Sequence, residues 1–142
     1  MGRLRQEATL ASFETKRLSS APDLTAPDGS NVRLLLALSG GSMAHFELAP
    51  GHVSIAVAHR TVDEIWYFLT GRGEIWRREG GQADVTAVEP GVCISIPCGT
   101  VFQFRSDGAE PLTAVAITMP PWPGEDEAYS VQGHWQSKLA DS

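Results

Sequence analysis

The chain has 142 residues and a formal net charge of −6, with 42% hydrophobic and 20% charged residues. This composition allows one domain and excludes wholesale disorder, collagen-like repeats and coiled coils. Because only 11 Lys and Arg residues are present, and phosphate binding requires clustered basic side chains, we expect no nucleic-acid partner.

Residues 1–31 are predicted to form an N-terminal arm and a connector. The first twenty residues carry charges throughout and lack the hydrophobic stretch of a secretory signal. Pro22, Pro27 and the Asp28-Gly29 pair then indicate a turn-rich connector. No apolar run anywhere approaches the roughly 18 residues of a membrane span. We therefore expect a cytoplasmic protein that does not contact membranes.

Residues 32–118 change to short apolar runs that are separated by glycine, proline and aspartate. Nine such runs at close spacing, without a helix-length periodic segment between them, predict an all-β sandwich or barrel. The predicted strands are Val32–Leu38, Met43–Leu48, Val53–His59, Glu64–Leu69, Gly73–Arg78, Asp84–Val88, Val92–Ile96, Val101–Arg105 and Leu112–Thr118.

Residues 119–142 are predicted to form a tail. The run Pro120-Pro121-Trp122-Pro123 ends the last strand, because each proline lacks the N–H that a strand ladder needs. Exposure of Trp122 and Trp135 to water would be costly, so we expect this Pro-rich tail to pack on the barrel or on a partner subunit.

Two stretches of the chain repeat a spacing of glycines around polar residues. In the first, His59 lies eight residues after a glycine, and Glu64 follows five residues later. In the second, a Pro-x-Gly begins six residues after a glycine. Both spacings resemble the two motifs of the cupin superfamily, which implies a small single-domain, cupin-like double-stranded β-helix (jelly-roll) barrel. The matching residues are Gly51, His59, Glu64 and Gly71, followed by Gly91, Pro97 and Gly99.

The metal-binding part of the motif is degenerate. Cupins that hold a metal point three histidines and one glutamate into the barrel, whereas here Val57 and Phe102 occupy two of the histidine positions. Two remaining ligands, His59 and Glu64, should bind a divalent metal weakly. If Zn, Fe, Mn or Ni does bind, His45 on the preceding strand is the best candidate for a third ligand.

Without a metal, His59 and Glu64 are candidates for general acid/base catalysis. Strand alternation places Glu64 on the same face as Trp66 and Phe68, which the resemblance directs toward the barrel interior. Burial among aromatic rings favours the protonated carboxyl, whereas a neighbouring His59 would favour the anion. The predicted ligand pocket is lined by His45, Val57, Trp66, Phe102 and Phe104.

Three functions remain open on this evidence. The first is a small-molecule-binding cupin with a reduced metal centre, acting as a sensor or accessory protein. The second is an enzyme of dioxygenase, isomerase or lyase type that acts on a small organic substrate. The third is a structural protein with a filled barrel. We also expect a homodimer, because exposed sheet edges and the apolar positions Leu34, Leu36 and Leu38 need to be covered.

Overall fold

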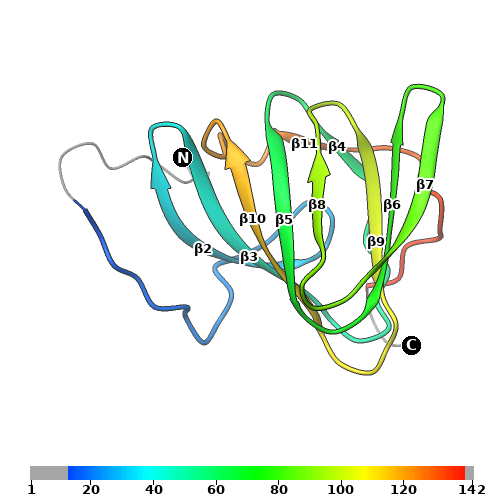
Figure 1. The fold of residues 1–142 in the computed structure, drawn as a ribbon, viewed down its shortest axis with the longest axis horizontal. Coiled ribbons are helices and arrows are strands. Elements are labelled where there is room, and N and C mark those ends of the chain that lie inside the picture. The colour runs from blue at the N-terminus through cyan, green and yellow to red at the C-terminus, as the bar shows by residue number, and fades with distance from the viewer. Residues whose placement is uncertain (1–12, 140–142) are drawn as a thin grey trace.

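The computed structural model describes residues 13–139. In this range the chain forms eleven strands, and all of their pairings are antiparallel. Figure 1 shows the two resulting sheets on opposite sides of the molecule. The six-stranded sheet has the order β1 (Leu24–Thr25), β2 (Asn31–Leu38), β3 (Gly41–Leu48), β10 (Leu112–Met119), β5 (Asp63–Thr70), β8 (Cys93–Ile96). The five-stranded sheet has the order β11 (Ala128–Ser130), β4 (Val57–His59), β9 (Val101–Ser106), β6 (Gly73–Glu79), β7 (Gln82–Val88).

The all-β, jelly-roll prediction is confirmed, and each of the nine predicted strands has a counterpart. The run expected at Val53–His59 is shorter than predicted, because only Val57–His59 pairs as a strand and Val53 forms isolated bridges. Two short strands, β1 and β11, were not predicted. Both lie in segments expected to be connector or tail, where two or three paired residues leave no periodic pattern. In the described range, no helix is long and apolar enough to cross a membrane.

The core lies between the two sheets and follows strand alternation. On β5 the buried residues are Glu64, Trp66 and Phe68, while the residues between them are exposed. Trp66 lies at the centre, with its ring 5.1 Å from that of Phe104 and 5.6 Å from that of Phe102. The inner face of β10 carries alanines at positions 114 and 116, and their small side chains leave room for these rings.

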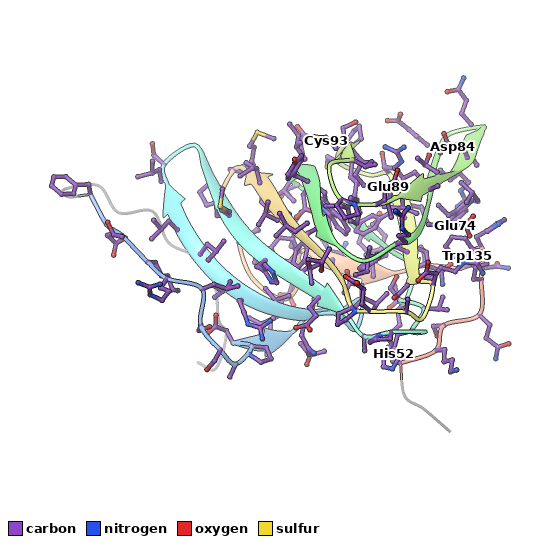
Figure 2. All side chains as sticks on the ribbon, turned by 60° about the horizontal axis from the view of Figure 1, so that its bottom comes forward. His52, Glu74, Asp84, Glu89, Cys93 and Trp135 are labelled. Carbon is purple, nitrogen blue, oxygen red and sulfur yellow. The ribbon has the colours of Figure 1, made fainter. Side chains whose placement is uncertain are left out.

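The C-terminal segment, red in Figure 1, packs on the outside of the five-stranded sheet. His134 stacks on Trp76 of β6 at 5.4 Å, and Arg105 of β9 lies 4.2 Å from the ring centre of Trp135. Figure 2 shows Trp135 close to Glu74, whose carboxylate accepts a hydrogen bond from the same Arg105.

Gln103 fastens this segment to the sheet. Its side chain points away from the cavity, as alternation with Phe102 requires, but the tail covers it and leaves it 1% exposed. Its amide nitrogen donates to the carbonyls of Ser54 and Trp135 at 2.8 and 2.9 Å. Its oxygen accepts from the backbone N–H groups of His134 and Trp135, both at 2.9 Å. One buried side chain therefore forms four hydrogen bonds.

Replacing Gln103 with leucine should lower the free energy of unfolding by about 3 kcal/mol, because buried backbone groups lose their partners. The matched variant Gln82→Leu, at an exposed position of β7, should change stability by less than about 0.5 kcal/mol. Urea denaturation measures both values, and chymotrypsin cleavage after Trp135 should accelerate only in Q103L. Equal stability of Q103L and the wild type would show that these bonds do not hold the tail.

The outer face of the six-stranded sheet is apolar and exposed. Ile65 and Tyr67 of β5 are 43% and 47% exposed, and Leu38 at the end of β2 is 64% exposed. Leu34 and Leu36 are half-buried rather than open. Leu34 also lines the cavity between the sheets, so the prediction that it lies on the outer face is wrong. Burial of such a face in a homodimer stays a prediction.

Candidate functional site

A cavity of about 450 Å³ lies between the two sheets. Its walls come from the inner faces of β2, β3, β4, β5, β9 and β10, so both sheets contribute. Two segments outside the predicted barrel complete its rim, residues 23–28 and residues 122–128. The exposed side chains of Asp23 and Glu125 border the opening.

Glu64 is buried in the cavity wall at 2% exposure. Its two carboxyl oxygens accept hydrogen bonds from Trp66 Nε1 at 2.7 Å and from Thr118 Oγ1 at 2.9 Å. Burial raises the pKa of Glu64 from its ordinary 4.5 to about 7, and the two hydrogen bonds lower it only in part. Near neutral pH this carboxyl therefore exchanges between its acid and its anion.

His59 reaches the same cavity from β4 and is 5% exposed. Its ring meets those of Phe102 and Trp122 edge to face, each at 5.2 Å. Its Nδ1 lies 4.0 Å from Glu64 Oε1 and has no hydrogen-bond partner. Burial lowers the pKa of His59, and the nearby carboxylates of Asp28 and Glu127 offset this only in part.

His59 and Glu64 therefore do not form the charge-stabilised pair that the sequence analysis considered. The imidazole of His59 is neutral near pH 7, so it does not stabilise the Glu64 anion. The donors that do so are Trp66 and Thr118. The site combines an uncharged base with a carboxyl that holds its proton up to neutral pH, which is a suitable combination for proton transfer.

Asp28 is a site residue that the sequence analysis missed. It lines the cavity, is 6% exposed, and its Oδ1 accepts from Ser30 N–H at 2.9 Å and Ser30 Oγ–H at 2.6 Å. Burial raises its pKa, which Ser30 and His59 partly offset. The Asp28-Gly29 pair indicated a turn correctly, but the pairing of β1 with β2 is what places this turn at the cavity.

Glu127 is a second residue that the sequence analysis missed, and its hydrogen bonds fix the position of the cavity rim. Its carboxylate accepts hydrogen bonds from the N–H and Oγ1–H of Thr61 and from Val62 N–H, at 2.6 to 2.9 Å. These bonds tie the tail to the turn before β5, on which Glu64 lies. Trp122 is held over the cavity beside His59 by a separate contact, because its backbone N–H donates to Ser42 Oγ of β3 at 3.0 Å. The sequence predicts a Pro-rich tail over residues 119–142 and assigns no contact to Glu127.

Three of the predicted pocket residues meet His59 and Glu64 in the cavity. Val57 of β4 lies directly opposite Phe102 of β9, and Trp66 of β5 completes the wall. Phe104 does not reach the cavity, because it packs behind the ring of Trp66 in the core. The prediction that it lines the pocket is therefore wrong.

His45 also lies outside the cavity, so its assignment as a pocket residue and third metal ligand is wrong. The alternating inner positions of β3 are Ala44 and Phe46, both in the cavity wall. His45 points to the other face of the sheet, where Arg33 and Glu47 are its charged neighbours. His45 was proposed because the motif lacks two of its histidines. Strand alternation, however, places the His45 side chain on the face of the sheet that points away from the interior.

The residues present do not fit the metal centre that the resemblance implies. His59 and Glu64 are the two ligands left, while Val57 and Phe102 present hydrocarbon at the other ligand positions. Within residues 13–139, no group of three His, Cys, Asp or Glu side chains is placed to hold a metal ion together. A divalent ion would find too few donors and an apolar wall here.

Comparisons with known proteins agree with this fold. A family model described as a cupin domain matches residues 44–118, more than half of the chain. Comparison with curated proteins finds no matching sequence. Among solved structures, an uncharacterised conserved protein with a double-stranded beta-helix domain from Klebsiella pneumoniae aligns with a TM-score of 0.64 and 17% identity, covering 84% of this chain and all of that one.

Two solved structures of named proteins share the architecture. The capsular polysaccharide assembling protein CapF from Staphylococcus aureus has a TM-score of 0.65 at 15% identity, covering 73% of this chain and 32% of that one. An oxalate oxidase has a TM-score of 0.66 at 20% identity, covering 83% and 63%. At such identities the likeness concerns the fold alone.

Proposed function

This chain belongs to the cupin family, and we propose that it binds a small organic molecule in its cavity without a resident metal, as a cytoplasmic sensor or accessory protein. The observation that supports this is the buried His59 Nδ1, which lacks a hydrogen-bond partner and belongs to a side chain that lines a cavity with aromatic walls. A buried polar atom without a partner costs free energy, and a bound ligand can supply the missing hydrogen bond.

The composition of the walls supports the same proposal. Apolar and aromatic side chains with a few convergent polar groups are typical of sites for small organic ligands. Phe46 and Trp122, which are half-buried, leave ring surface available at the cavity. The presence of an open cavity argues against a barrel that is merely filled with side chains.

The neutral fluorescent probe N-phenyl-1-naphthylamine should bind saturably to the wild-type protein, because its rings match the apolar walls. In Ala128→Phe the added ring fills the rim beside His59, and affinity should fall at least about tenfold. The control Ala87→Phe, at an exposed position of β7, should bind like the wild type. Fluorescence titration measures this, and circular dichroism verifies folding. Equal binding by both variants would place the probe elsewhere and refute the proposal.

A second candidate, an acid/base enzyme, is favoured by the opposite pKa directions of His59 and Glu64 at 4.0 Å. Such an enzyme would move a proton between carbon or oxygen atoms of a bound substrate, as isomerases and lyases do. The two candidates differ in the variant His59→Ala. An enzyme loses turnover while it retains binding, whereas a binding protein shows only a change in affinity.

A further inference from the structure

The charges around the cavity have one sign. Four carboxyl groups line it, those of Asp23, Asp28, Glu64 and Glu125. His59 is the one basic side chain among the described lining residues, and Lys and Arg are absent from that set. An anionic ligand would therefore enter without a counter-charge and close to two buried carboxyl groups, which is unfavourable in a poorly solvated site.

The aromatic rings that line the cavity also favour a cationic ligand over an anionic one. The rings of Phe46, Trp66, Phe102 and Trp122 all border the cavity. Phe46 lies 5.2 Å from Trp66, and Trp66 lies 5.6 Å from Phe102, so these three form one continuous group. Aromatic faces carry partial negative charge and attract ammonium groups, most strongly where water is excluded.

His59 indicates where a polar group of the ligand would bind. Its Nδ1 is buried, unpartnered and 4.0 Å from Glu64 Oε1. An uncharged imidazole has one nitrogen that accepts a hydrogen bond, and the ammonium group has several N–H donors. A single ammonium group could therefore donate to His59 and interact with the carboxylates of Glu64 and Asp28, which are electrostatically coupled to one another.

Taken with the proposed function, on which it rests, this arrangement assigns a ligand class. We propose that the cavity selects a primary organic ammonium ion with an apolar, ring-sized substituent. The ammonium group binds among Asp28, His59 and Glu64, and the substituent packs on the rings of Trp66 and Phe102. The two exposed carboxylates at the opening, Asp23 and Glu125, attract the cation toward the cavity.

Three probes of nearly equal size test this proposal. They are 2-phenylethylammonium, the neutral 2-phenylethanol and the anion phenylacetate, measured by isothermal titration calorimetry at about pH 8, where the amine stays protonated. The ammonium ion should bind at least about tenfold more tightly than the alcohol, and phenylacetate should not bind measurably.

Asp28→Asn should weaken binding of the ammonium ion about tenfold, because a charged partner is lost. Binding of the alcohol should stay unchanged, because the amide keeps an oxygen for Ser30. The matched control is Asp84→Asn, whose side chain lies on the distant β7 strand in Figure 2 and should have no effect. Equal binding of the ammonium ion and the alcohol, or tighter binding of phenylacetate, would overturn the ligand class but leave the proposed function standing. Absence of binding by all three probes and by N-phenyl-1-naphthylamine would refute both.

Discussion

Replacing both Val57 and Phe102 with histidine is expected to raise the affinity for Ni²⁺ at least about 100-fold over the wild type. The two positions lie opposite each other on β4 and β9, and both border the cavity that holds His59 and Glu64. Two imidazoles would therefore join the two ligands already present and restore the four positions of the cupin motif. The wild type has too few donors for a transition metal, so its expected content is well below about one tenth per chain.

Mass spectrometry of untagged protein, purified without chelator, measures the metal content, and calorimetric titration with Ni²⁺ measures the affinities. The control adds His59→Ala and Glu64→Ala to the double-histidine variant, which should return the affinity to the level of the wild type. Near-stoichiometric metal in the wild type that is lost in the His59→Ala, Glu64→Ala variant would contradict the metal-free proposal.

Raising the pH from about 4.5 to about 7 is expected to destabilise the folded protein through Glu64. Its folded-state pKa lies above its ordinary value, so the folded state retains a proton that the unfolded chain releases. At about 1.4 kcal/mol per pH unit, ionisation between 4.5 and about 7 removes about 3 kcal/mol of stability. The contribution is fully present below pH 4.5 and is lost as the pH rises through 7.

The variant Glu64→Gln isolates this contribution, because glutamine cannot ionise and keeps an oxygen for Trp66. Asp28, whose pKa is also raised, adds a slope of the same sign in both proteins. His59, with a lowered pKa, adds the opposite slope, since stability is lost as the pH falls below 6.5. Urea denaturation across this pH range should show that the free energy of unfolding of E64Q rises relative to that of the wild type as the pH rises. Parallel curves would show that Glu64 ionises normally.

The sequence alone determined the fold class and half of the site. Turn glycines and short apolar runs predicted nine strands, because local chain conformation reflects local residue types. The motif spacing selected His59 and Glu64, and the period-2 alternation of β5 directed Glu64 and Trp66 inward. The sequence also showed that Val57 and Phe102 occupy two positions at which metal-binding cupins have histidine.

Only the tertiary structure decided which other residues reach the cavity. Asp28 and Trp122 lie outside the predicted barrel strands. Asp28 reaches the cavity through the pairing of β1 with β2, and Trp122 through the hydrogen bond from its N–H to Ser42. His45 is excluded from the cavity because β3 presents Ala44 and Phe46 to it. The physical reason is the range of the interactions. Alternation and turns act over a few residues, whereas the cavity is closed by contacts between residues up to 80 positions apart, which no local pattern encodes.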